Sequence, residues 1–118
     1  MNIEDFRNYC LKKKGVEEGF PFGEDTLVFK VMGKMFALAG LKYDSLRVNL
    51  KCDPERAILL REEYEDIQPG YHMSKKHWNT VHFEEGLEND FLLELVDHSY
   101  DLVVKTLKRK DREVLEQL

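Results

Sequence analysis

The chain has 118 residues, the size of one domain, and we treat residues 1–118 as a single domain. Its 18 Lys and Arg residues against 23 Asp and Glu residues give a formal net charge of -5, which excludes a protein whose whole surface is basic. The composition, 42% hydrophobic and 35% charged, is that of an ordinary folded domain. No apolar run approaches the roughly 18 to 20 residues that cross a bilayer, so we expect no membrane span.

The first residues, Met1 to Asp5, include acids and no cationic segment before an apolar stretch. We therefore expect no secretory signal and a cytosolic protein. The cysteines, Cys10 and Cys52, lie in no CxxC or Cys/His spacing. We interpret them as buried free thiols in a reducing compartment rather than as a disulfide.

A first helix is predicted over about residues 3 to 13, because apolar residues recur there at helical spacing. Asn2 is its candidate N-cap, with Asp5 three residues later. Lys12 to Lys14 follow at the carbonyl end, where cations are favourable. The stretch from Gly15 to Asp25 is rich in Gly, Pro and Glu, and we expect a connection there with room for one short edge strand.

Two strands are predicted next, Leu27 to Met32 and Met35 to Ala39, joined by Gly33-Lys34 in a two-residue type II′ turn. In this register Met32 faces Met35. The predicted core face carries Leu27, Phe29, Val31, Phe36 and Leu38. The other face carries Lys30 with smaller or softer residues, namely Val28, Met32, Met35, Ala37 and Ala39.

The segment Leu46 to Lys51 alternates cleanly between apolar and polar residues, which predicts a half-buried antiparallel strand. Its polar side chains, Arg47, Asn49 and Lys51, share the outer face. Asp53-Pro54-Glu55 is a strong helix start, and the helix is predicted to run to about Tyr64, before Gln68-Pro69-Gly70.

The last part of the chain predicts two strands and a long helix. The strands are Tyr71 to Met73 and Trp78 to Phe83, and the second turns Trp78, Thr80 and His82 outward. Asn89 is the candidate cap of a helix whose apolar stripe runs from Leu92 to Leu107. The mixed charges after Lys108 predict an extension of that helix or a frayed tail.

The predicted order is therefore α-β-β-β-α-β-β-α, with short turns between most neighbouring strands. This order predicts an α+β fold in which the helices cover one face of a largely antiparallel sheet. The second face of the sheet is then left to solvent or to a partner.

Charge is distributed unevenly over these predicted elements. Acidic residues concentrate on the second and third helices, whereas the open face of the sheet is predicted to carry Lys30, Arg47 and Lys51 beside Trp78. Lys34, Lys75, Lys76 and His77 lie at turns on its rim. Cations can neutralise phosphates while an aromatic ring stacks on a base, so this face is a candidate for nucleic-acid binding. The alternative is an ordinary solvated face, since outward strand positions often carry Lys, Arg and Thr.

The residues give little support for a metal site, a catalytic nucleophile or a phosphate-binding loop. His98 can share a helix face with Glu94 and Asp101, which would allow a weak cation site, but ordinary hydrogen bonding on the helix surface explains the pattern as well. The serines and cysteines stand in no nucleophile motif, and the glycines form no phosphate-binding loop. We therefore assign no catalytic residue, no metal ligand and no cofactor.

Several motifs, in order, carry a family resemblance over nearly the whole chain. They are Phe20-Pro21-Phe22-Gly23, Gly33-Lys34-Met35-Phe36-Ala37, Val48-Asn49-Leu50-Lys51-Cys52, Pro69-Gly70-Tyr71-His72-Met73, Lys75-Lys76-His77-Trp78-Asn79-Thr80-Val81 and Asp97-His98-Ser99-Tyr100. Together they resemble the MmcQ/YjbR family of small bacterial proteins.

The resemblance implies a CyaY-like (frataxin-like) fold and a DNA-binding role, through an arrangement likened to a double-wing motif. The resemblance implies that Lys34 and the run from Lys75 to Trp78 are functional residues. A frataxin-like fold also suggests iron, but the first helix here ends in lysines instead of forming an acidic surface.

We expect a non-catalytic, monomeric module that binds double-stranded DNA with little sequence selectivity. The residues expected to contact it are Lys30, Lys34, Arg47, Lys51, Lys75, Lys76, His77 and Trp78. The alternative is a protein-interaction module in which Trp78 is the buried anchor and the cations attract an acidic partner.

Overall fold

The computed structural model describes residues 1–84 and 86–118. Within these ranges the chain forms a six-stranded antiparallel sheet in the order β1-β2-β3-β4-β6-β5. The strands are β1 (Val16–Gly19), β2 (Thr26–Val31), β3 (Lys34–Gly40), β4 (Arg47–Lys51), β5 (Ile67–Pro69) and β6 (Trp78–His82). The helices are α1 (Ile3–Leu11), α2 (Pro54–Glu63), α3 (Asn89–Lys105) and α4 (Arg109–Glu116).

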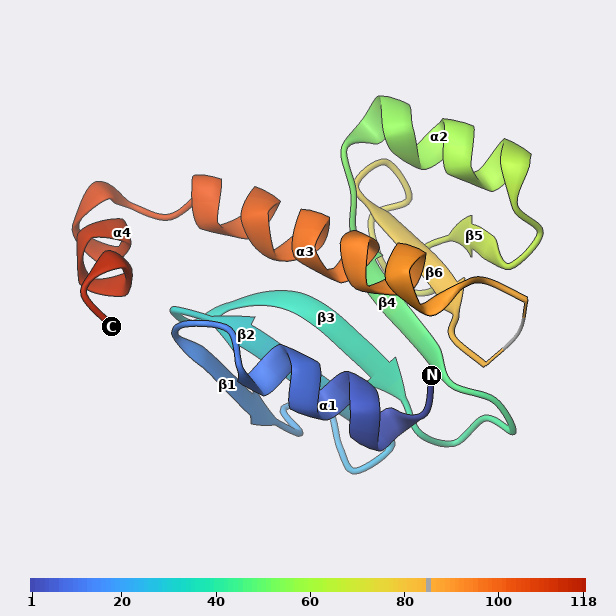
Figure 1. The fold of residues 1–118 in the computed structure, drawn as a ribbon, viewed down its shortest axis with the longest axis horizontal. Helices are drawn as coiled ribbons and strands as arrows, with labels where there is room; N and C mark the ends of the chain where they lie inside the picture. Colours follow the sequence, from blue (N-terminus) through green and yellow to red (C-terminus); the bar gives the residue numbers. More distant parts are fainter. Residues whose placement is uncertain (85) are drawn as a thin grey trace.

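Helices α1 and α3 lie across one face of the sheet, and α2 lies beside β5 and β6 (Figure 1). Buried residues of all three helices join the same apolar core as the inner side chains of the strands. The predicted α+β class, with helices on one face of an antiparallel sheet, is confirmed. We call the opposite face the open face.

The helix starts follow the capping signals of the sequence, with one exception. The Asn2 side chain accepts a hydrogen bond from the backbone N–H of Asp5 at 2.8 Å, and Asp53 accepts one from Arg56 at 3.1 Å. The prediction that Asn89 caps the long helix is wrong, because Glu88 is the N-cap and Asn89 is the first helical residue.

The predicted register of the β2–β3 hairpin is wrong. Met32 and Gly33 form its turn, with φ of 49° and 84°, and Val31 pairs with Lys34. Positive φ at both central residues defines a type I′ turn, whose twist suits a hairpin. A register shift between Phe29 and Lys30 then follows in the ladder.

This shift changes which side chains face the core. Ala37 and Ala39, predicted for the open face, belong to the core cluster beneath the helices. Leu38, predicted for the core, pairs with Val28 and lines the open face instead. Phe36 stays in the core, where its ring meets the edge of Tyr100 at a centroid distance of 5.4 Å.

Two further predictions about elements are wrong. The predicted strand Tyr71 to Met73 is a turn, and the strand that flanks β6 on the side away from β4 is β5. His72 has a φ of 59°, a left-handed value that ends regular strand geometry. After Lys108 the chain forms the separate helix α4 rather than an extension or a frayed tail, because Leu115 is buried against the core.

The core is centred on Phe6 of α1, whose ring meets the edges of Phe29 and Phe83 at centroid distances of 5.3 and 5.2 Å. Cys10 and Cys52 are buried and free, as predicted. Burial is the main cause that raises the pKa of Cys10 to about 12 and that of Cys52 to about 11. None of the described helices is both long and apolar enough to span a membrane.

Candidate functional site

The open face is built from the outward positions of the central strands. Because side chains alternate along a strand, the core residues Val48, Leu50 and Val81 fix their neighbours on the opposite side. The outward residues are Arg47, Asn49 and Lys51 of β4, Trp78, Thr80 and His82 of β6, and Lys30, Met35 and Leu38 of the hairpin. Their placement on β4 and β6 agrees with the sequence prediction.

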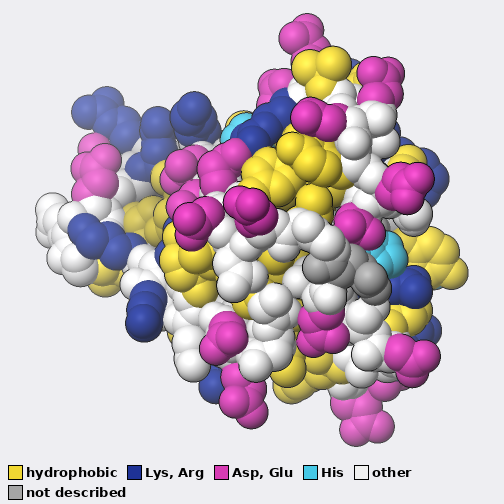
Figure 2. Space-filling view, turned by 45° about the vertical axis from the view of Figure 1, so that its right-hand side comes forward, with side chains coloured by type: hydrophobic (Ala, Val, Ile, Leu, Met, Phe, Trp, Pro, Cys, Tyr) yellow, Lys and Arg dark blue, Asp and Glu magenta, His cyan; other side chains and the backbone are white. Residues whose placement is uncertain are grey.

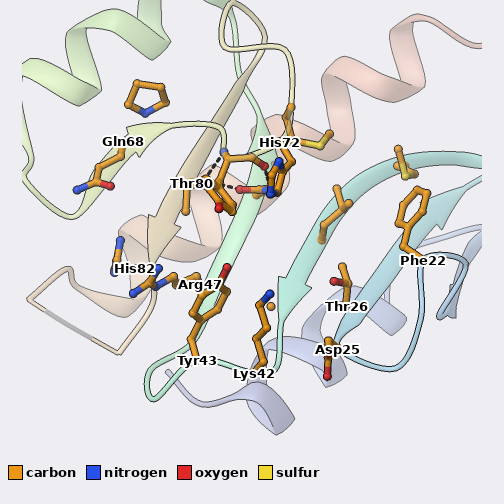
Figure 3. A pocket seen from close by; sticks show the side chains of 17 residues that line it. Phe22, Asp25, Thr26, Lys42, Tyr43, Arg47, Gln68, His72, Thr80 and His82 are labelled. Atoms are coloured by element: carbon orange, nitrogen blue, oxygen red, sulfur yellow. Dashed lines mark hydrogen bonds between the residues drawn. The ribbon is translucent and has the colours of Figure 1, made fainter.

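This face is hollowed into a groove of about 420 Å³. The β1–β2 and β3–β4 connections form its walls at one end of the sheet, and the β5–β6 connection forms the wall on the other side (Figure 3). The groove is lined by Phe22, Asp25, Thr26, Met35, Leu38, Gly40, Lys42, Tyr43, Arg47, Asn49, Gln68, Pro69, Tyr71, His72, Met73, Thr80 and His82. Its volume lies within the roughly 300 to 1,000 Å³ of small-ligand sites.

Hydrogen bonds fix the wall that carries Tyr71. The backbone N–H of Tyr71 donates to Thr80 Oγ1 at 3.0 Å, and its carbonyl accepts from Asn49 Nδ2 at 3.3 Å. The Thr80 hydroxyl in turn donates to Asn49 Oδ1 at 2.5 Å. Two side chains of the sheet therefore hold this loop over the open face, while the Tyr71 side chain itself remains exposed.

The same loop closes tightly on β6. The backbone N–H of Gly70 donates to the carbonyl of Trp78 at 2.9 Å. A Cβ at Gly70 would lie only 2.8 Å from Trp78 Cβ, so this close approach requires glycine. Next to it, the rings of Tyr71 and His72 have centroids 4.0 Å apart. The loop thus presents two adjacent aromatic rings at the edge of the groove.

The opposite wall contains a stacked cation. The guanidinium carbon of Arg47 lies 4.1 Å from the ring centroid of Tyr43. The Tyr43 ring itself lies against Gly40, where a Cβ would come within 2.8 Å of it. Lys42 extends into the groove from the same connection (Figure 3). Two cations therefore stand across the groove from the Tyr71 wall.

The residues predicted to bind nucleic acid do not form one cluster. Arg47 lines the groove. Lys30, Lys51 and Trp78 lie on the same face but outside the groove lining, and each is half-buried. The open face therefore keeps its predicted cations, but Trp78 does not stand at its centre.

The remaining predicted residues lie away from the groove. Lys34 pairs with the core residue Val31, and its Nζ donates to the carbonyl of Thr106 at the end of α3 at 3.1 Å. Lys75 folds back onto its own loop, with its Nζ 3.0 Å from the carbonyl oxygen of Gly70. Lys76 and His77 are exposed in the β5–β6 connection.

The expected separation of charge, with acidic residues on the helices and cations on the open face, is only partly correct. Figure 2 shows Asp and Glu side chains spread over the helical side, with Lys and Arg gathered at the end that holds α4. On the open face, however, Glu17 of β1 is the cross-strand partner of Lys30, and Asp25 lines the groove. Both acids lie in the stretch from Gly15 to Asp25, which the sequence assigned to neither face.

The helix-surface cluster around His98 is taken up by structural contacts. His98 Nε2 accepts a hydrogen bond from the backbone N–H of Asp53 at 3.1 Å, and Glu94 forms an ion pair with Arg56. Burial is the main cause that lowers the pKa of His98, and the bond to Arg56 lowers that of Glu94. Among the described residues, no group of three or more His, Cys, Asp or Glu side chains is placed to hold a metal ion.

Several groove residues had not been predicted from the sequence as binding residues: Phe22, Lys42, Tyr43, Tyr71 and His72. Each lies in a connection between strands, where alternation gives no information about direction. The available signal was an aromatic residue beside a turn, as in Phe20-Pro21-Phe22-Gly23 and Pro69-Gly70-Tyr71. The exposed fractions, 65% for Phe22 and 59% for Tyr71, mark these rings as accessible.

Comparisons with known proteins agree with this architecture. A family model described as YjbR matches residues 11–102. The chain is 38% identical to the uncharacterised protein YbdF of Escherichia coli O157:H7, over 92% of this chain and 89% of that protein. It is 34% identical to the uncharacterised protein YjbR of Escherichia coli strain K12, over 100% of both chains.

Solved structures with a similar fold also come from relatives of this chain. Protein DR2400 of Deinococcus radiodurans, with a domain described as DUF419, superposes with a TM-score of 0.92 at 40% identity, covering 98% of this chain and 88% of that one. A Pseudomonas syringae protein superposes with a TM-score of 0.75 at 30% identity, covering 86% of this chain and 98% of that one. With its fold, its sequence motifs and its full-length relatives in agreement, the chain belongs to the YjbR family.

Proposed function

We propose that the protein is a non-catalytic DNA-binding module of the bacterial cytoplasm, and that it binds DNA through the open face of its sheet. The observation that supports this most is the composition of the groove. Arg47 and Lys42 stand on one wall and the exposed ring of Tyr71 on the other. Cations that neutralise phosphates beside an aromatic ring that stacks on bases are a combination that single-strand nucleic-acid-binding proteins use.

The proposed contact set differs from the one expected from sequence. Lys30, Arg47 and Lys51 remain in it, since all three lie on the open face. Lys42 and Tyr71 join it from the groove walls. Lys34 leaves it, because its Nζ is bonded to the end of α3. Trp78 contributes to the face from outside the groove.

A salt titration tests the proposal. Binding of a fluorescein-labelled DNA oligonucleotide is followed by fluorescence anisotropy at several salt concentrations. Phosphate neutralisation predicts that the logarithm of the affinity falls linearly with the logarithm of the salt concentration, with a slope of about 0.7 to 0.9 per contact. Arg47→Ala should weaken binding and reduce the slope by about one contact. The matched control is Lys12→Ala, which removes an exposed cation at the end of α1 and should leave the slope unchanged.

The rival proposal is a protein-interaction module that binds an acidic partner with the same face. The exposed rings of Phe22 and Tyr71 favour it as anchors in place of the half-buried Trp78. The titration separates the two proposals. If no DNA of any form binds at low salt, the DNA-binding proposal is wrong and the protein partner takes its place.

A further inference from the structure

We infer that the groove receives an unpaired base of single-stranded DNA, stacked on Tyr71, so that the protein prefers single strands to duplex. The inference rests on the proposed function and names its substrate class. It departs from the duplex binding expected from sequence.

The shape of the site is the first argument. The cations and rings line a hollow of about 420 Å³ beneath three loops instead of a flat or convex surface. A duplex keeps its bases stacked inside and offers phosphates and base edges to a protein. Only a base that has left the stack can reach the floor of this groove, where Thr80 and His82 lie (Figure 3). The free volume suits one nucleotide and not a double helix.

The second argument is that the stacking wall is fixed before any ligand arrives. Bonds of 3.0 and 3.3 Å tie the backbone of Tyr71 to Thr80 and Asn49, and no other wall of the groove is bonded to its floor through side chains among the described residues. The ring nevertheless stays 59% exposed. Because the backbone that carries this ring is already held in place, stacking of a base on the ring costs little additional backbone entropy.

The third argument is charge. Arg47 lies over the ring of Tyr43, and its guanidinium N–H groups make no hydrogen bond within residues 1–84 and 86–118, so its edge can bind a phosphate. Lys42 stands beside it, and Asp25 is the acid in the groove lining. The cations therefore face the Tyr71 wall across the groove, so a base stacked on Tyr71 would direct its phosphates toward Arg47 and Lys42.

A direct comparison of four DNA probes tests the inference. They are a labelled 12-nucleotide strand of thymidines, the matched duplex, a duplex with a single bulged thymidine, and thymidine monophosphate. At low salt we expect the single strand to bind at least about tenfold more tightly than the duplex. The bulged duplex should lie between them, and the monophosphate should bind more weakly than the strand because it lacks neighbouring phosphates.

Two substitutions at Tyr71 isolate the stacking contact. Tyr71→Ala should weaken binding of the single strand roughly tenfold to a hundredfold, in line with the contribution of one stacked base. Tyr71→Phe keeps the ring and should bind nearly as tightly as the parent chain. Amide NMR shifts provide a readout that needs no variant: the thymidine strand should shift Tyr71, Arg47 and His82 and leave Glu113 on α4 unchanged.

The outcomes distinguish a failure of the single-strand inference from a failure of the DNA-binding proposal. If the matched duplex binds as tightly as the single strand, or if Tyr71→Ala binds like Tyr71→Phe, the inference is wrong while the DNA-binding proposal stands. If the monophosphate binds as tightly as the strand, the groove is a mononucleotide site and the inference is again wrong. If no probe binds at low salt, the DNA-binding proposal itself fails.

Discussion

The two faces of the sheet use their polar groups in different ways. On the helical face, Ser99 of α3 accepts from the backbone N–H of Lys51 at 2.9 Å and donates to the carbonyl of Phe36 at 2.5 Å, so its hydroxyl joins two strands of the sheet. On the open face, Thr80 and Asn49 use theirs to hold a loop whose aromatic side chain stays exposed. The polar groups on the helical face bond within the fold, whereas those on the open face hold a loop with an exposed ring at the edge of the groove.

The two faces should differ most in how much a lost aromatic ring lowers the stability of the fold. Phe6 is fully buried between Phe29 and Phe83. We expect Phe6→Ala to lower the free energy of unfolding by about 3–5 kcal/mol, because it removes a buried ring and leaves a cavity. Urea denaturation followed by circular dichroism measures this. Phe22→Ala on the groove wall is the control, with an expected change under about 0.5 kcal/mol. Equal losses in the two variants would remove the distinction between the faces.

The next effect concerns the buried hydroxyl of α3. Ser99→Ala removes the hydroxyl that bonds Lys51 and Phe36, which leaves a partly buried N–H and a buried carbonyl without these bonds. We expect a loss of about 1–3 kcal/mol in the free energy of unfolding. Ser74→Ala, at an exposed position of the β5–β6 connection, should change stability by less than about 0.5 kcal/mol. A neutral Ser99→Ala variant would show that the bridge is not needed.

A smaller and more local effect is expected on the open face. Thr80→Val keeps the shape of the side chain but removes its bonds to Tyr71 and Asn49. We expect global stability to fall by only about 0.5–1.5 kcal/mol. The amide of Tyr71 should exchange with deuterium faster, as measured by NMR, whereas the amide of Val48 should keep its protection. Unchanged exchange at Tyr71 would mean that Thr80 does not hold the groove wall.

The smallest expected effect is a pH dependence of the free energy of unfolding, and it arises from His98 on the helical face. The pKa of His98 is lowered, mainly by burial, and its Nε2 accepts a bond from Asp53 that requires the neutral ring. The unfolded chain therefore takes up this proton at a higher pH than the folded chain. Stability from His98 is complete above about pH 6.5 and falls as the pH drops below it.

Denaturation at pH 7.5 and pH 5.5 measures this contribution. In His98→Gln, the amide oxygen can still accept the bond from Asp53, and the loss of stability between the two pH values should shrink. The pair of Glu94 with Arg56 adds a loss at more acidic pH, because the carboxylate pKa is lowered and protonation breaks the pair. An unchanged loss in His98→Gln would assign the pH dependence to another group.

The sequence determined the class of the fold and most of its elements. Strict alternation placed Arg47, Asn49 and Lys51 on one face of β4, and capping signals located the starts of α1 and α2. These features depend on local periodicity and local hydrogen bonds, so neighbouring residues are enough to predict them. Family motifs extended the prediction to the whole chain.

Tertiary structure alone decided the register of the hairpin and the shape of the site. The turn at Met32 and Gly33 and the shift at Phe29 exchanged Leu38 for Ala37 and Ala39 in the core. Such choices depend on how strands pair and twist, which no single segment specifies. The groove brings together the β1–β2, β3–β4 and β5–β6 connections, which are distant in sequence. Its exposed rings, Phe22 and Tyr71, lie in these connections, where the alternation of side chains along a strand no longer predicts their direction. Hydrogen bonds between different segments place the Tyr71 loop there: Asn49 donates to the Tyr71 carbonyl, and the Tyr71 N–H donates to Thr80.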